Sequence, residues 1–304
     1  MIPNDPLSAP PHALRLLMDR LARWTGLDLG RGAAHAALVR YLRRRVDHAD
    51  PQALAHYVDG LVTPQHPEVA RIVDAITVCY STFFRDPDQL AAVGAVLRDA
   101  PGQPASIWVP GCATGEEAYS IALVAEAAGR RAAILATDIN ARALAHAARG
   151  AYGAWSVRDL PPAHALPRRA DGLYEVPERL RRAVTFERHN LMDPLPDRTA
   201  GWDVILCRNV LMYLDRGRAR ELVGRLAAAL RPGGHLFLGA NDILEHVPAP
   251  LRFVRIEGRH VLQRAPDPTG PQAPGVARTS TDTSAAVAAP PSPPLPAPAA
   301  PVSP

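Results

Sequence analysis

ASIWVPGCATGEEAYSIALVAEAAG, residues 105–129, decides the fold class of this chain. It opens with a short apolar run that ends in glycine, a pattern typical of a buried parallel strand. A turn that contains Gly111 and Gly115 follows, and the remainder has the composition of a helix. A strand, a glycine turn and a helix in this order predict the first unit of an α/β sheet. Such a sheet binds its ligand at the carboxyl ends of the strands.

The same alternation continues toward the C-terminus. Further strands are expected at residues 132–139, 183–191, 202–214 and 235–241, and helices at 141–152 and 219–230, the last one closed by residues 231–234. Residues 252–264 alternate about Gly258 and predict a closing antiparallel hairpin. These elements predict an α/β fold with a doubly wound, mostly parallel sheet.

Other parts of the chain depart from this rhythm. Residues 12–85 carry apolar side chains at helical spacing and no strand-like alternation, so a small helical N-terminal domain is expected. Residues 151–183 are too long for a tight connection and predict a small inserted subdomain within the domain 86–264. The proline- and alanine-rich residues 265–304 cannot form a core and are expected to be disordered, as are residues 1–11.

Composition limits the classes of function. Of the 304 residues, 47% are hydrophobic, a fraction typical of globular proteins. The net charge of +4 is too small for a nucleic-acid binder. Three well-separated cysteines, with no metal-ligand spacing, indicate neither a disulfide framework nor a bound metal. No secretory signal and no apolar run long enough to cross a bilayer are evident, so a soluble, cytoplasmic protein is expected. Nothing demands a dimer, and a monomer is expected.

Polar side chains follow the expected strands. Glu117 begins the helix after the glycine turn, where it is suited to attract a cation or merely to favour the helix dipole. Asp138 ends the second strand, where it is suited to accept hydrogen bonds from a ribose or to cap the next helix. Asn190, Asn209 and Tyr213 lie toward the ends of later strands. Because strand ends meet at one edge of a parallel sheet, nucleoside binding is favoured for the set.

An ordered set of motifs resembles a known family. TFFRDPDQL (82–90), GCATGEEAYSIA (111–122), ATDIN (136–140), NLMD (190–193) and CRNVLMYLD (207–215) look like the CheR-type chemotaxis methyltransferases. Members transfer a methyl group from S-adenosylmethionine to glutamate side chains of chemoreceptors. The resemblance spans roughly residues 12–264. It implies a Rossmann-like class I methyltransferase sheet with a small antiparallel insertion, preceded by an all-α N-terminal domain.

The resemblance also implies roles for particular residues. Arg85 reaches from the interdomain linker into the cofactor site, and Arg85 and Tyr213 orient the accepting carboxylate. We expect Phe83 and Phe84 to anchor the linker, with Asp86 capping the next helix and Gln89 completing a capping box. The residues expected to bind S-adenosylmethionine are Cys79, Ser81, Arg85, Gly111, Gly115, Glu117, Asp138, Asn190, Leu191, Arg208 and Asn209.

The acceptor is less firmly specified. The family uses a basic helix against an acidic, helical receptor region, and Arg40, Arg43, Arg44 and Arg45 match it, although an ordinary solvated helix face has the same charge pattern. Cys79 and Ser81 replace the asparagine and threonine usual in the family. Ala240, Asn241 and Asp242 replace a frequent HSE motif. Two alternatives therefore remain: a methyltransferase for another acceptor, and a cofactor-binding signalling protein that has lost transfer activity.

Overall fold

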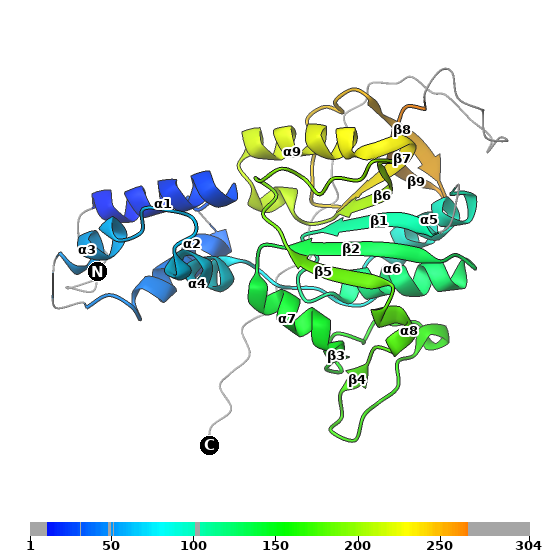
Figure 1. Ribbon diagram of the computed structural model, residues 1–304, viewed down its shortest axis with the longest axis horizontal. Coiled ribbons are helices and arrows are strands. Elements are labelled where there is room, and N and C mark those ends of the chain that lie inside the picture. Colours follow the sequence, from blue (N-terminus) through cyan, green and yellow to red (C-terminus); the bar gives the residue numbers. More distant parts are fainter. Residues whose placement is uncertain (1–10, 31, 48–49, 51, 101–103, 267–304) are drawn as a thin grey trace. The chain divides into compact units, whose positions relative to one another are not determined.

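The computed structural model describes residues 11–30, 32–47, 50, 52–100 and 104–266 (Figure 1). The segments expected to be disordered lie outside these residues, apart from residue 11, where the first helix begins, and residues 265–266. Among the described residues, no helix is long and apolar enough to span a membrane.

The N-terminal part of the chain is helical, as the sequence predicts. Its described helices are α1 (Pro11–Thr25), α2 (Gly32–Leu42), α3 (Ala53–Asp59) and α4 (Pro67–Ile76). They bury a core of their own in which Leu17, Leu21, Leu38 and Ile72 are inaccessible. The apolar residues recur every three to four positions, so one face of each helix is available for this core.

The basic cluster is only partly helical. Because α2 ends at Leu42, one arginine of the cluster lies on the helix and the others lie in the turn that follows: Arg40, then Arg43, Arg44 and Arg45. The amide N–H groups of Arg44 and Arg45 bond three residues back, which tightens the last turn beyond α-helical geometry. Arg45 also forms an ion pair with Glu68 at 3.3 Å. The expectation that all four arginines lie on one helix is therefore wrong.

A seven-stranded sheet forms the second part of the chain. Its order is β5-β2-β1-β6-β7-β9-β8, with the first five strands parallel and β9 antiparallel to both neighbours. The strands are β1 (Ala105–Pro110), β2 (Ala132–Asp138), β5 (Val184–Arg188), β6 (Trp202–Cys207), β7 (Leu230–Leu238), β8 (Leu251–Ile256) and β9 (Arg259–Arg264). This confirms the class I methyltransferase sheet and its closing hairpin.

Helices cover both faces of this sheet (Figure 1). α5 (Pro87–Asp99), α6 (Glu116–Ala127) and α7 (Ala141–Arg149) pack with one set of strand side chains, and α9 (Arg216–Ala229) packs with the other. Alternation along β1 makes this possible: Ile107 and Val109 enter the first core, whereas Trp108 enters the second. Both faces of the central strands are therefore buried, which explains their continuous apolar sequence.

The insertion after α7 contains a small antiparallel pair, as expected. β3 (Ala151–Tyr152) pairs with β4 (Tyr174–Glu175), and the short helices η2 (Pro162–His164) and α8 (Glu178–Arg181) belong to the same segment. Tyr152 is fully buried and donates a hydrogen bond to the Thr114 carbonyl at 2.7 Å. The insertion is thereby fastened to the turn after β1.

Local corrections concern caps and strand ends. Asp86 caps α5 by accepting from the Gln89 amide, as expected, but the Gln89 side chain donates to the Leu238 carbonyl instead of completing a capping box. Asn140, not Asp138, caps α7. β7 begins at Leu230, so the expected turn 231–234 lies in the strand. The strand expected through residue 214 ends at residue 207 and is followed by η3 (Leu211–Tyr213).

One buried carboxylate ties the central strands at their amino ends. Asp203 accepts hydrogen bonds from the Ser106 amide at 2.7 Å, the Ser106 hydroxyl at 2.8 Å and Arg231 Nε at 2.5 Å. Its side chain is 9% exposed. These contacts join β1, β6 and β7, whose opposite ends carry the polar residues expected in the site.

We predict that Asp203→Ala lowers the free energy of unfolding by about 2–3 kcal/mol, because it leaves buried donors unsatisfied. Asp197→Ala, an exposed aspartate near the same edge, is the control and should change stability by less than about 0.5 kcal/mol. Urea denaturation measures both values. Equal, small losses in the two variants would refute the structural role of Asp203.

Candidate active site

The linker before α5 is anchored by its two phenylalanines. Phe83 is fully buried, and its ring meets that of Tyr152 edge-on with centroids 5.0 Å apart. Phe84 is also buried, and its ring stacks on His164 at 4.9 Å. The linker is thus fastened to the insertion, which confirms the anchoring role expected from the sequence. Arg85, the next residue, follows directly from this anchor.

The backbone around Arg85 is held in an unfavourable conformation. Phe84 and Asp86, its two neighbours, have φ angles of 54° and 60°. Residues with a Cβ atom rarely adopt this left-handed region, which costs roughly 1–3 kcal/mol per residue. Ala113 and Asn209, in the loops after β1 and β6, share this conformation. Within the described residues, the only other case outside glycine lies in the β8–β9 turn, so the strain is concentrated in the linker before α5 and in the loops after β1 and β6.

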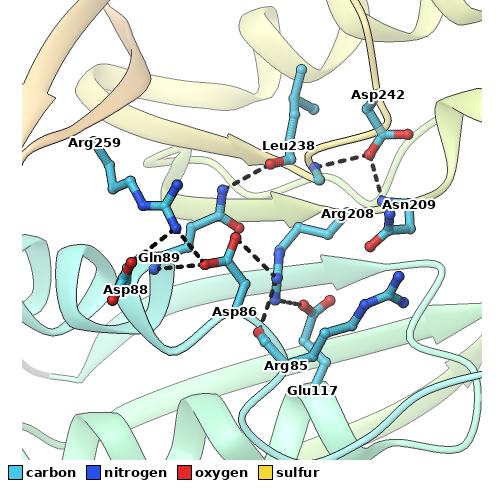
Figure 2. Close-up of polar contacts among 11 residues, drawn as sticks. Arg85, Asp86, Asp88, Gln89, Glu117, Arg208, Asn209, Leu238, Asp242 and Arg259 are labelled. Atoms are coloured by element: carbon cyan, nitrogen blue, oxygen red, sulfur yellow. Dashed lines mark hydrogen bonds and ion pairs between the residues drawn. The ribbon is translucent and has the colours of Figure 1, made fainter. Parts of the chain in front are cut away.

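A buried ion pair lies at the centre of this region (Figure 2). Arg208, the residue after β6, donates from Nη1 to the carboxylate of Glu117 in the first turn of α6. Its Nη2 donates to the Arg85 carbonyl at 3.0 Å. Side-chain exposures of 4% and 13% show that both partners are removed from water. Burial raises the pKa of Glu117, and the charge of Arg208 opposes that rise.

Arg85 extends its own guanidinium alongside this pair. Within the described residues, no hydrogen bond or ion pair engages that guanidinium, and the ring of Tyr80 lies 5.8 Å away. Figure 2 shows it beside the Glu117 carboxylate. Burial raises the pKa of Tyr213, and the charge of Arg85 opposes the rise, as it does at Glu117. The three side chains therefore share one electrostatic environment.

The end of β2 forms the second half of the site. Asp138 accepts from the amide of Ala113 and from that of Asn140, both at 2.8 Å, so its carboxylate fixes the turn after β1. Burial raises the pKa of Asp138, whereas these amide hydrogen bonds lower it. Burial also raises the pKa of Cys79 to about 12, with the charge of Asp138 adding to the effect. Cys79 is consequently a neutral thiol close to this carboxylate.

Two glycines of this turn are required by protein packing. Gly111 and Gly115 have φ angles of 72° and 92°. A Cβ atom at Gly111 would lie 2.4 Å from a Val210 methyl, and one at Gly115 would lie 2.7 Å from the Ala147 methyl. Both positions therefore need glycine, because a side chain would strain the backbone and would find no space. These contacts explain the glycines without invoking a ligand.

Other residues expected in the cofactor site have different contacts. Asn190 donates to the Trp24 carbonyl of α1 at 2.6 Å and accepts from the Met192 amide. Leu191 packs with the core around α9, and its carbonyl accepts from Arg225. The structure records no side-chain hydrogen bond for Ser81 among the described residues. Asn190 thus connects the helical part to the segment that follows β5.

Asp242 is a structural residue of the site that sequence reasoning missed. It is 7% exposed and accepts from the amides of Gly239, Asn209 and Met212, at 2.9, 2.5 and 3.3 Å. Its carboxylate joins the loop after β7 to the loop that carries Asn209 and Tyr213. The replacement of the usual HSE motif was the one signal in the sequence, and it was interpreted as leaving room for a different acceptor.

The sheet order and the polar residues at its strand ends define a class I methyltransferase. Residues 80–259 match the family described as CheR methyltransferase, SAM binding domain, and the chain belongs to this family. Its cofactor is S-adenosylmethionine.

Curated relatives agree with this assignment. Chemotaxis protein methyltransferase 2 of Vibrio cholerae is 32% identical over 221 residues, which cover 68% of this chain and 77% of that protein. An uncharacterized 104.1 kDa protein of Rhodobacter capsulatus is 31% identical over 74% of this chain. The probable biofilm formation methyltransferase WspC of Pseudomonas aeruginosa is 33% identical over 62% of it. The match spans 25% of the Rhodobacter protein and 49% of WspC.

The described side chains suit this cofactor. Asp138 places a carboxylate at the end of β2. In nucleotide-binding sheets, a carboxylate at this position accepts hydrogen bonds from the ribose hydroxyls. Glu117 places a second carboxylate beside the first turn of α6, where it complements a cation. Arg208 Nε is buried without a hydrogen-bond partner in the described residues, so the site contains an unsatisfied donor. The two carboxylates therefore match a molecule with both hydroxyl and cationic groups.

We predict that Asp242→Ala lowers the free energy of unfolding by about 2–3 kcal/mol, since it removes the acceptor of several backbone amides. Asp242→Asn keeps one acceptor oxygen and should lose less. Glu245→Ala, whose ion pairs with Arg216 and Arg220 are exposed, should change stability by under about 1 kcal/mol. Chemical denaturation gives the three values, and an Asp242→Ala variant as stable as Glu245→Ala would contradict the role of this clamp.

Proposed function

We propose that this protein transfers the methyl group of S-adenosylmethionine to glutamate side chains of a chemoreceptor-type signalling protein. The products would be a glutamate methyl ester and S-adenosylhomocysteine. The observation that carries the proposal is the Arg85 guanidinium, which lies beside the Glu117–Arg208 pair with no anionic partner within the described residues (Figure 2). Names of relatives such as chemotaxis protein methyltransferase 2 support the acceptor class.

A carboxylate acceptor agrees with the groups around Arg85. A glutamate with a reference pKa of about 4.3 is already ionised at neutral pH, so the reaction needs no general base. Arg85 would donate charge-assisted hydrogen bonds to that carboxylate, and the Tyr213 hydroxyl would add a neutral one. The raised pKa of Tyr213 keeps its hydroxyl protonated and able to donate.

Positioning is the main contribution of the protein. The cofactor supplies an electrophilic methyl group on a sulfonium centre. Alignment of an acceptor oxygen with such a centre can be worth roughly 7–11 kcal/mol. The strained linker and the carbonyl contact to Arg208 hold the backbone of Arg85, which reduces the freedom of its side chain. Glu117, Asp138, Gly111 and Asn209 are proposed to line the cofactor side, together with Cys79.

The helical part is proposed to meet the acceptor protein. Exposed Arg40 and Arg44 suit an acidic, helical receptor segment, although Arg45 is already engaged by Glu68 and Tyr41. The likeness to WspC, named for biofilm formation, is compatible with a receptor outside flagellar chemotaxis. The proposed acceptor is therefore defined by its chemistry: an acidic helical segment with accessible glutamates.

The test is transfer of a labelled methyl group from S-adenosylmethionine to cytoplasmic receptor fragments. The product should release methanol in mild base, because it is a carboxyl ester. Arg85→Ala and Tyr213→Phe should lower kcat by about a hundredfold, since misplaced groups cost that much. Their affinity for S-adenosylhomocysteine, measured by calorimetry, should change by less than about threefold. Arg252→Ala, an exposed arginine on β8, is the control.

Three outcomes would contradict the proposal. Cofactor binding without transfer to any fragment favours the signalling protein that lacks activity. A methyl group that resists base identifies an acceptor other than a carboxylate. Equal losses of kcat and cofactor affinity in Arg85→Ala would assign that side chain to cofactor binding instead of acceptor orientation.

A further inference from the structure

A second arginine lies at the pocket that Arg85 lines. The pocket has a volume of about 560 Å³, and Tyr80, Phe84, Arg85, Arg158 and Asp159 are among its lining residues. It joins two segments that are distant in the sequence, the linker before α5 and the turn that follows β3. The turn that follows β3 lies outside the family motifs.

The turn after β3 is firmly attached to the linker. The Phe83 amide donates to the Ser156 carbonyl at 2.9 Å, and the Ser156 hydroxyl donates to Glu116 at 3.0 Å. The rings of Tyr80 and Trp155 meet edge-on with centroids 4.9 Å apart. The two walls of the pocket are therefore fixed relative to each other.

Tyr80 of the pocket lining and Trp155, the aromatic residue that it contacts, are about half exposed to water. Tyr80 is 55% exposed and Trp155 is 49% exposed, although both are large enough to gain from burial. Exposed aromatic residues together with arginine are the composition that protein–protein interfaces favour. The exposure of this pair marks a surface suited to contact another protein chain.

Arg158 is held over the ring of Trp155. Its guanidinium carbon lies 4.0 Å from the ring centroid, and its Nη1 donates to the Trp155 carbonyl at 2.8 Å. Its Nε lies 3.4 Å from the exposed Asp159 carboxylate, an ion pair that water screens. For Nη2 the structure records no acceptor among the described residues. A stacked guanidinium is fixed in orientation and can still donate from its edge to a carboxylate.

The charges of the pocket favour an acidic occupant. Asp86, the other carboxylate of the lining, is engaged by Arg259 Nη2 at 2.9 Å and caps α5. Asp159 is the carboxylate that competes for Arg158. Arg85 has no carboxylate within ion-pair distance in the described residues. The pocket therefore presents two guanidinium groups, of which one is unpaired and the other only weakly paired.

We propose that Arg158, stacked on Trp155, binds a second acidic side chain of the acceptor while Arg85 holds the glutamate that is methylated. This inference rests on the proposed function and makes it more specific: the substrate is a segment with at least two neighbouring carboxylates. Arg158 and Trp155 determine specificity and take no part in methyl transfer itself.

The test measures binding separately from methylation. The probe is a fluorescein-labelled helical peptide of alanine and glutamate, compared with the same peptide in which glutamine replaces glutamate. Fluorescence anisotropy should show tight binding of the glutamate peptide alone. Arg158→Ala and Trp155→Ala should weaken it by about five- to tenfold, the effect of a lost charge-assisted contact. Asp159→Asn should strengthen binding, because it removes the competing carboxylate.

Arg168→Ala, an exposed arginine of the same insertion outside this pocket, should bind like the wild type. Circular dichroism verifies that each variant is folded. Unchanged binding in both Arg158→Ala and Trp155→Ala, equal binding of the glutamine peptide, or no binding by the wild type overturns the proposal. If the glutamate peptide binds through Arg158 but no receptor fragment is methylated, the acidic site stands and the proposed function falls.

Discussion

The side chain of Arg208 makes the contacts on which the rest of the site depends. One terminal nitrogen donates to the Glu117 carboxylate and the other to the Arg85 carbonyl, so three distant segments meet at one guanidinium. A buried charge is costly unless it is paired, and removal of either partner would leave the other uncompensated. This requirement fixes the start of α6, the loop after β6 and the linker together.

These contacts hold the linker backbone on either side of Arg85 in an unfavourable conformation. Phe84 and Asp86 remain in left-handed conformations only because their surroundings enforce them: the ring stack on His164, the cap of α5 and the carbonyl contact to Arg208. Arg85 is thereby displayed from a rigid backbone, with its guanidinium still available. Rigid presentation lowers the entropic cost of binding an acceptor.

Hydrogen bonds also join the helical part to the strand ends. Asn140 donates to Thr77 Oγ1 at 2.7 Å, Asn190 donates to the Trp24 carbonyl, and the Asp28 amide donates to the Tyr213 carbonyl at 2.8 Å. Asn190, which was expected to bind the cofactor, thus connects the two parts. A receptor that contacts the helices would act on a scaffold continuous with Tyr213.

The sequence could predict the fold because apolar period and turn residues are local signals. Runs such as residues 105–110 and 202–207 identified buried strands, and the motifs placed Glu117 and Arg208 after these strands and Arg85 in the linker. Contacts between segments left no such signal. Asp242 appeared only as part of a replaced motif, since a carboxylate that binds three backbone amides depends on how the loops fold. Asn190 was expected to bind the cofactor, and its hydrogen bond to the Trp24 carbonyl was not foreseen. The Trp155–Arg158 stack was likewise invisible because its partner, Tyr80, lies on another segment.

The most direct test of the central claim is a crystal structure of the protein with S-adenosylhomocysteine bound. The account predicts that Glu117 and Asp138 contact the ligand, while the Arg85 guanidinium points toward its sulfur atom with Arg208 still bound to the Arg85 carbonyl. An Arg85 side chain directed into bulk solvent, with a relaxed linker backbone at Phe84 and Asp86, would contradict it.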